Sequence, residues 1–151
     1  MTQPSARLLI AVLDDESEHS TLMHTVLHEV AGGYAYRFFD NAPDMISALP
    51  GLLDQVCLIS LDHDLGPNRH RDGTTFDPGT GRDVADALAL HKPVCPIMIH
   101  TSNGDAAPGM RRVLEESGWL IHRVFPHDDT AWIRDDWRTE IITILNQRDD
   151  G

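Results

Sequence analysis

The chain has 151 residues, a length that suits one globular domain able to bury about 70% of its unfolded surface, and we expect a single domain over residues 1–151. Its formal net charge of -12 argues against sequence-independent binding to duplex DNA, which depends on basic surface patches. No stretch approaches the ~20 apolar residues of a membrane helix, and the apolar run at 8–13 ends in acids rather than in a small-residue cleavage site. These features predict a cytoplasmic protein with neither a membrane span nor a signal peptide.

Short apolar runs alternate with helical patterns along the chain. Strands are expected at residues 8–13, 34–39, 56–61, 96–99 and 119–124. Helices are expected at residues 17–31, 41–51, 82–91 and 130–147, and in a segment that starts late and ends near 117. This alternation predicts an α/β fold with a five-stranded parallel sheet in the flavodoxin-like order 2-1-3-4-5 and helices on both faces.

Three side chains have environments that follow from these expected elements. Cys57 and Cys95 fall at strand positions, and we expect buried free thiols rather than a redox pair. Trp132 lies off the apolar stripe of the last helix, so we expect partial burial at the edge of that stripe, with a partner surface as the alternative.

The connection after the third strand, residues 66–81, is unusually long and is rich in Gly, Pro, Thr, Asp and Arg. Most connections in α/β units have about 2–6 residues, so we expect a binding loop rather than a flexible insertion. Arg69, His70 and Arg71 could supply phosphate contacts there, and a solvated loop is the alternative.

Polar residues follow three of the expected strands where each one ends. Asp14 and Asp15 follow the first strand, and Asp62, His63 and Asp64 follow the third. The fourth is followed by His100, Thr101, Ser102 and Asn103. In a sheet of this order the first and third strands flank the point where strand order reverses, and ligands bind outside the carboxyl ends of the strands there. We therefore expect these side chains to meet at one edge of the sheet.

Several carboxylates at one edge repel one another unless a positive charge lies between them. Oxygen-rich sites with few imidazoles select hard cations, so the pattern predicts a site for Mg²⁺ or Mn²⁺ ahead of Zn²⁺. A helix cap or a turn is the alternative for any single aspartate that follows a strand.

The other polar residues have both chemical and structural interpretations. His100 is either a catalytic residue beside the acids or a core histidine satisfied by a backbone carbonyl. His63 is a proton carrier, a ligand, or a side chain packed under a crossover helix. Thr101 or Ser102, together with the amides before Gly104, could cradle phosphate oxygens at a helix start.

The acids resemble those of the response-regulator receiver fold, with DDE after the first strand, an aspartate after the third and a threonine after PIMIH in the fourth. This resemblance implies that the first acids bind Mg²⁺ and that Asp62 accepts a phosphoryl group. Receivers carry Lys-Pro after the fifth strand, whereas this chain has Phe125-Pro126, and its single lysine, Lys92, lies elsewhere. The departure counts against a phosphorylation switch.

Over nearly its whole length the chain is more similar to a divergent group, the cyclic-phosphate processing receiver domain family. The similarity rests on LDDE, ISLDHDLG, a loop with Gly-Thr-Gly, and IHTSN. It implies action on cyclic phosphate ends of a phosphorylated small molecule or of RNA, in a nucleotide or RNA-repair setting. It also implies a metal role for Asp14, Asp15 and Asp62, and acid/base roles for His63 and His100.

Three functions are compatible with these residues. The first is metal-dependent hydrolysis of a cyclic phosphate or related phosphodiester, in which His100 moves a proton. The groups that position the ligand are then Asp64, Thr101, Ser102 and Asn103. In a variant course Asp62 is the nucleophile and forms an aspartyl phosphate. The second function is a receiver module phosphorylated on Asp62 that acts through a partner surface, on a second copy or another protein. The third is an interaction domain that keeps only the fold and binds no metal.

Overall fold

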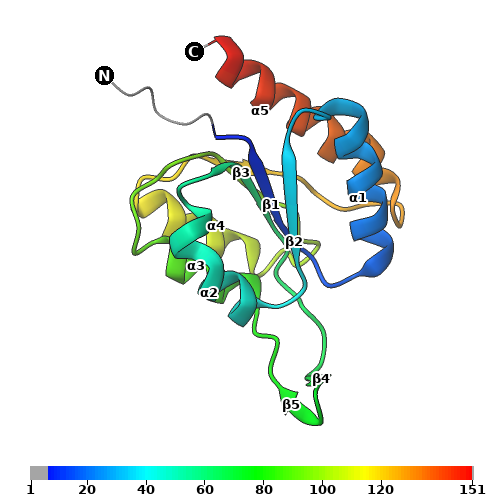
Figure 1. Cartoon of the computed structure of the whole chain (residues 1–151), viewed down its shortest axis with the longest axis vertical. Coiled ribbons are helices and arrows are strands. Elements are labelled where there is room, and N and C mark those ends of the chain that lie inside the picture. The colour runs from blue at the N-terminus through cyan, green and yellow to red at the C-terminus, as the bar shows by residue number, and fades with distance from the viewer. Residues whose placement is uncertain (1–6, 151) are drawn as a thin grey trace.

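The computed structural model describes residues 7–150 of the chain. Five strands form one parallel sheet in the order β2-β1-β3-β6-β7, with helices on both faces, which confirms the predicted fold (Figure 1). The strands β4 and β5 lie outside this sheet in a separate hairpin, so the order is the expected 2-1-3-4-5 when sheet strands alone are counted.

The elements agree closely with the expected ranges. The sheet strands are β1 (Leu9–Leu13), β2 (Ala35–Phe39), β3 (Val56–Leu61), β6 (Ile97–Ile99) and β7 (Ile121–Arg123). The helices are α1 (Ser17–Val30), α2 (Ala42–Leu52), α3 (Gly81–Leu88), α4 (Ala107–Glu116) and α5 (Arg138–Asp150). None of the helices within residues 7–150 combines the length and the apolar character that crossing a bilayer requires.

Each face of the sheet has its own hydrophobic core. Helices α2, α3 and α4 cover one face, and α1 and α5 cover the other (Figure 1). Successive strand residues point to opposite faces, so each central strand contributes to both cores. In β1, Leu13 belongs to the core under α2–α4 and Val12 to the core under α1 and α5. The same alternation decides which face each polar residue beyond the strand ends will occupy.

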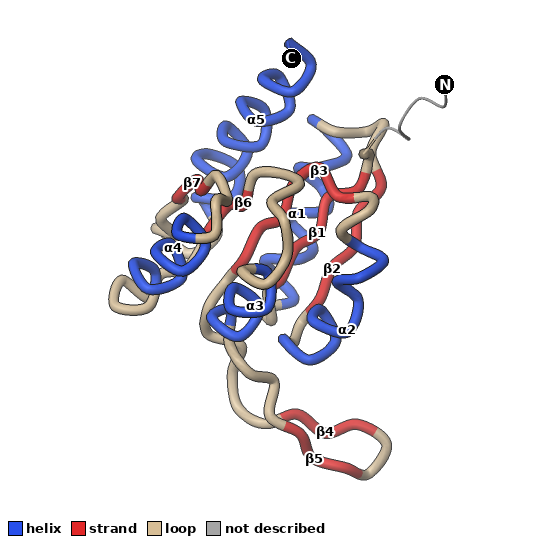
Figure 2. Tube along the Cα trace, turned by 90° about the vertical axis from the view of Figure 1, so that its left-hand side faces the viewer, coloured by secondary structure: helices blue, strands red, loops and turns tan. Residues whose placement is uncertain are grey.

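The long connection after β3 contains a hairpin that the sequence analysis did not predict. Strands β4 (Arg69–Arg71) and β5 (Thr74–Phe76) pair antiparallel around Asp72 and Gly73, which have φ values of 53° and 78°. An Asp-Gly pair with positive φ is the turn that a two-residue hairpin requires, and it was the available sequence signal. We call residues 66–80 the arm. It projects from the end of the molecule at which β1 and β3 end (Figures 1 and 2).

The arm is fixed at both of its ends. Before it, Leu65 is buried, and Asp64 forms an isolated antiparallel bridge with Thr80 at the far end. The backbone N–H of Gly81 donates to the carbonyl of His63 at 2.8 Å. The chain returns so closely that a Cβ on Gly81 would lie 1.9 Å from the carbonyl oxygen of Asp62.

The last predicted helix is divided by a π-helical turn at Ile133–Trp137, which precedes α5. Residues five apart come to the same side of a π-helical turn, and Trp132 and Trp137 are both fully buried. The prediction that Trp132 would be only partly buried, or would mark a partner surface, is therefore wrong. Its indole N–H donates to the carbonyl of Asp129 at 2.9 Å, so its polar group is satisfied.

Both cysteines are free among the described residues, as expected. Cys57 is buried and Cys95 is partly buried. Burial raises the pKa of both thiols, that of Cys95 to about 12. Neither thiol therefore ionises near neutral pH, which agrees with a structural role.

Replacing Gly81 with alanine tests how tightly the arm is rooted. The added methyl carbon has no room beside the Asp62 carbonyl, so the backbone must move, and we expect a loss of about 3 kcal/mol in the free energy of unfolding in urea. The matched control is Gly51→Ala in α2, where a Cβ meets nothing within 4 Å and a gain of about 0.5–1 kcal/mol is expected. Equal stability of the two variants would contradict the close approach.

Candidate functional site

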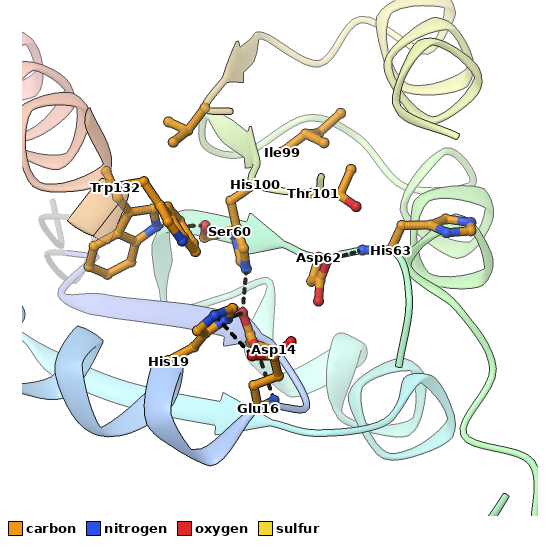
Figure 3. A network of polar contacts seen from close by, with 12 residues as sticks. Asp14, Glu16, His19, Ser60, Asp62, His63, Ile99, His100, Thr101 and Trp132 are labelled. Carbon is orange, nitrogen blue, oxygen red and sulfur yellow. Dashed lines mark hydrogen bonds and ion pairs between the residues drawn. The ribbon is translucent and has the colours of Figure 1, made fainter. Parts of the chain in front are cut away.

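The register of the sheet brings polar residues of three strands abreast. Leu13 pairs with Leu61, and Leu61 pairs with Ile99. The next residues along these strands, Asp14, Asp62 and His100, are therefore level with one another. Strand alternation directs them to the face covered by α1 and α5, where Figure 3 shows them together.

Asp14, Asp15 and Asp62 form a cluster in which one carboxylate oxygen of each lies within 4.8 Å of the others. Asp14 is buried, whereas Asp15 and Asp62 are partly buried. Burial raises the pKa of Asp62 to about 6, and the negative charge of Asp14 adds to this rise. Burial and the charge of Asp14 also raise the pKa of Asp15. Three oxygen donors that repel one another fit a hard divalent cation such as Mg²⁺ or Mn²⁺.

Asp14 is held by three hydrogen bonds. Its Oδ1 accepts from the backbone N–H of Glu16 at 2.9 Å, and its Oδ2 lies 3.1 Å from both His19 Nδ1 and His100 Nε2 (Figure 3). Although burial alone would raise the pKa of Asp14, the hydrogen bonds from His100 and His19 hold it well below its usual range. Asp14 is therefore ionised in the folded protein at all ordinary pH values, unlike Asp62.

Hydrogen bonds on both sides of the His100 ring determine which of its nitrogens carries a proton. Because an ionised carboxylate can only accept, His100 Nε2 carries a proton and donates it to Asp14. On the other side, the indole Nε1–H of Trp137 donates to Ser60 Oγ at 3.1 Å, and Ser60 Oγ lies 2.6 Å from His100 Nδ1. In the tautomer with its proton on Nε2 alone, Nδ1 accepts from the Ser60 hydroxyl, which in turn accepts the indole N–H.

His100 lies beneath the carboxylates rather than at the surface. Its side chain is fully buried, both ring nitrogens are engaged, and the ring stacks on Trp132 with 5.7 Å between centroids. In this arrangement His100 faces Asp14 and has no open side toward a ligand. His100 is thus a buried histidine whose partners are a site carboxylate and a serine hydroxyl rather than a backbone carbonyl, and its catalytic role stays a prediction.

His19 is the residue at this site that the sequence analysis missed. Its Nδ1 contacts Asp14, its Nε2 lies 3.0 Å from Glu16 Oε2, and it lines an open pocket of about 680 Å³. The hydrogen bond to Asp14 raises the pKa of His19. The available signal was its position in the first turn of α1, since that turn starts at the edge where β1 ends.

His63 lies on the other side of the sheet from His100. Strand alternation turns its side chain away from Asp14 (Figure 3). Its Nδ1 lies 2.8 Å from Asp64 Oδ1. Its backbone N–H, however, donates to Asp62 Oδ1 at 2.7 Å. His63 therefore contacts the carboxylate cluster through its main chain and not through its imidazole.

The four residues predicted to position a ligand have different environments. Asp64 is exposed and accepts from the Asn103 side chain at 3.3 Å. Asn103 Oδ1 accepts the backbone N–H groups of Asp105 and Ala106, so this side chain caps the turn before α4. Thr101 is buried. Ser102 is exposed and lines the same pocket as His19.

The raised pKa of Asp62 predicts how stability depends on pH in the absence of divalent ions. Protonated Asp62 contributes stability below about pH 4, and this contribution is lost as the pH rises through about 6. Asp62→Asn, which stays neutral, should therefore be more stable than the parent protein at pH 7.5 by about 1–3 kcal/mol, with little difference at pH 4.

The free energy of unfolding in guanidinium chloride, measured with a chelator present at pH 7.5 and at pH 4, gives this difference. Asp54→Asn removes an exposed carboxylate just before β3, at the opposite edge of the sheet, and should leave stability nearly unchanged. A loss of stability in Asp62→Asn at pH 7.5 would contradict the predicted repulsion.

Comparison with known proteins places this geometry in a family. The profile of the cyclic-phosphate processing receiver domain matches residues 11–116, a range that includes the carboxylate cluster, His19 and His100. No relative was found among curated protein sequences.

Solved structures of receivers share the fold at low sequence identity. The phosphorylated cyanobacterial phytochrome response regulator RcpA is 10% identical with a TM-score of 0.71, over 94% of this chain and 96% of that one. A CheY-like receiver domain from Methanospirillum hungatei is 14% identical with a TM-score of 0.63, over 97% and 100%. The Mn²⁺-bound form of response regulator Rcp1 is 14% identical with a TM-score of 0.61, over 90% of each chain. The chain thus has the receiver fold, and it belongs to the cyclic-phosphate processing receiver domain family.

Proposed function

We propose that the protein is a metal-dependent phosphoesterase that opens a cyclic phosphate, or cleaves a related phosphodiester, on a small nucleotide or an RNA end in the cytoplasm. The observation that carries this proposal is the cluster of three carboxylates at the carboxyl edge of the sheet, where ligands of such sheets bind. Membership of a cyclic-phosphate processing family supports the substrate class. The Mn²⁺-bound form of Rcp1, which shares the fold, supports the choice of cation.

Asp14, Asp15 and Asp62 would hold the cation. A bound divalent ion at this place polarises a phosphodiester and makes a water molecule more acidic. The main chain keeps Asp62 in place, since the His63 N–H donates to its Oδ1. The low pKa of Asp14 keeps one ligand ionised at every working pH.

His100, Ser60 and Trp137 position Asp14 from below. Their hydrogen bonds run without interruption from the core to Asp14 Oδ2. Because these hydrogen bonds are buried and each of their donors has an acceptor, they restrict Asp14 to one orientation and keep the proton on His100 Nε2. His100 is thus a positioning residue in this proposal.

His19 is the imidazole placed to exchange protons with a substrate. It lines the open pocket, it lies beside Asp14, and its raised pKa favours the protonated form near neutral pH. A protonated imidazole can donate to the leaving ribose oxygen when the cyclic phosphate opens. The pocket beside it has room for the nucleoside part of a ligand, and Ser102 offers a hydroxyl on its wall.

Turnover of cyclic nucleotides tests the proposal directly. The purified protein with Mn²⁺ or Mg²⁺ should convert a 2′,3′-cyclic nucleotide to a nucleoside monophosphate, and chromatography measures the product. Asp62→Asn should lose at least about 10²-fold in kcat/KM, because it removes a charged ligand at the reacting group. Failure of every divalent ion to support turnover, with no metal-dependent rise in Tm, would overturn the proposal.

The role of His19 predicts a specific pH profile. His19→Asn keeps a donor near Asp14 but cannot exchange a proton, so we expect kcat to fall about 10²- to 10⁴-fold and the alkaline limb of the profile to disappear. His24→Asn, one turn further along α1, is the control and should retain parent activity. If His19→Asn kept an unchanged profile, another group would have to supply the proton.

A second function, phosphorylation of Asp62 in a signalling module, is favoured by the position of this residue at the end of β3 and by the fold shared with phosphorylated RcpA. Such a module would act through a surface for another protein or for a second copy. The absence of a lysine after β7 counts against this second function. The Arg123 guanidinium is already engaged, because it donates to the carbonyls of Ile99 and Thr101 at 3.2 and 2.6 Å.

If the protein is such a module, treatment with acetyl phosphate and Mg²⁺ should give a stable mass gain that requires Asp62, without turnover of cyclic nucleotides.

A further inference from the structure

The arm brings a positive charge to an edge that is otherwise acidic. Arg69, the first residue of β4, has its guanidinium 3.7 Å from Asp15 Oδ2 and 3.6 Å from Asp40 Oδ2. Asp15 belongs to the carboxylate cluster, so Arg69 lies beside the candidate metal centre. The other two basic residues of the arm lie elsewhere: Arg71 pairs with Asp44 at 3.0 Å, and His70 contacts Thr75 on the exposed hairpin.

The root of the arm determines where Arg69 lies. A Cβ on Gly66 would lie 2.9 Å from Asp15 Oδ2, and Gly66 has a φ of +79°, so the first residue of the arm is packed directly on that carboxylate. Leu65 is anchored in the core beside it. Arg69 follows four residues later and returns toward the same acids.

The hydrogen-bonding capacity of Arg69 is poorly used in the ligand-free protein. Its four polar contacts, to Asp15, to Leu65 and to both the side chain and the carbonyl of Asp40, lie between 3.4 and 3.7 Å. Its Nε is buried and has no hydrogen-bond partner anywhere in residues 7–150. Guanidinium groups that bind carboxylates or phosphates well do so at about 2.7–2.9 Å, usually through two parallel bonds. Arg69 is thus held near the site by long contacts, and none of its donors makes a hydrogen bond as short as those of a well-bound guanidinium.

The geometry points to Arg69 as the phosphate-binding residue of the site: the Arg69 guanidinium binds the non-bridging oxygens of a phosphoryl group that is held at Asp14, Asp15 and Asp62. This inference rests on the proposed function, because it places the phosphoryl group at the same carboxylates. Carboxylates repel a phosphate, so a ligand there needs a cationic partner besides the ion, and the planar fork of arginine matches two phosphate oxygens. Asp40 and Asp15 are the weak partners that the phosphate displaces.

This placement restricts the class of ligand. A group held between a cation at the carboxylates and the Arg69 fork must present free anionic oxygens on more than one side of phosphorus. Cyclic phosphodiesters and phosphate monoesters meet this requirement, and neutral triesters do not. Arg71 adds no second phosphate site, because its bonds to Asp44 already engage it.

Calorimetric binding of inorganic phosphate and of 2′,3′-cyclic AMP to the full chain, with Mn²⁺ present, tests the inference. Arg69→Ala should weaken both at least about 10-fold, and Arg69→Lys, which keeps the charge but loses the fork, by about 3- to 10-fold. Asp40→Asn removes a competing partner and should tighten binding by about 2- to 5-fold. Arg112→Ala removes an equal charge from an 81% exposed side chain on α4 and should change affinity by less than about twofold.

A nuclear magnetic resonance measurement gives a readout that does not depend on turnover. The side-chain N–H signals of Arg69 should shift on addition of phosphate, because its guanidinium exchanges long contacts with Asp15 and Asp40 for shorter bonds to phosphate oxygens. The signal of Arg112 should stay unchanged.

The outcomes separate this inference from the proposed function. Equal phosphate affinity in the parent protein and Arg69→Ala would overturn the role of Arg69, even if cyclic nucleotides are turned over. Binding that depends on Arg69 without any turnover would support the inference and remove the phosphoesterase. Absence of phosphate binding by the parent protein, with Mn²⁺ bound, would overturn the inference as well.

Discussion

The structure of this site depends on one constraint, the parallel register of β1, β3 and β6. Leu13, Leu61 and Ile99 are matched across these strands, so the residues that follow them stand abreast on one face of the sheet. Two of those residues are aspartates, and Asp15 adds a third carboxylate within 4.8 Å. Negative charges so close together are stable only with compensation, and the surrounding structure supplies it in different ways to each carboxylate.

Asp14 and Asp62 occupy opposite electrostatic environments although they lie side by side. Imidazole donors hold the pKa of Asp14 well below its usual range, whereas burial raises that of Asp62 to about 6. The difference arises from the core beneath Asp14, where the π-helical turn places Trp137 against Ser60 and Trp132 against His100. The π-helical turn before α5 thereby supports, through Trp137 and Ser60, the histidine that donates to Asp14.

The groups around the carboxylates give the site two unlike sides. On one side, the loop after β7 and the first turn of α1 border the pocket that His19 and Ser102 line. On the other, the arm carries Arg69 toward Asp15 and Asp40.

The sequence by itself determined the order of strands and helices and the acidic residues at the strand ends, because hydrophobic periodicity and chain order fix which residues terminate each parallel strand. Only the tertiary structure decided that His100 lies under Asp14, that His19 joins the site and that Arg69 alone of the arm's cations returns to it. These outcomes depend on how a helix turn, a π-helical irregularity and a hairpin pack against the sheet. Such packing couples residues up to 86 positions apart, as in the bond between Asp14 and His100, and no local pattern encodes it.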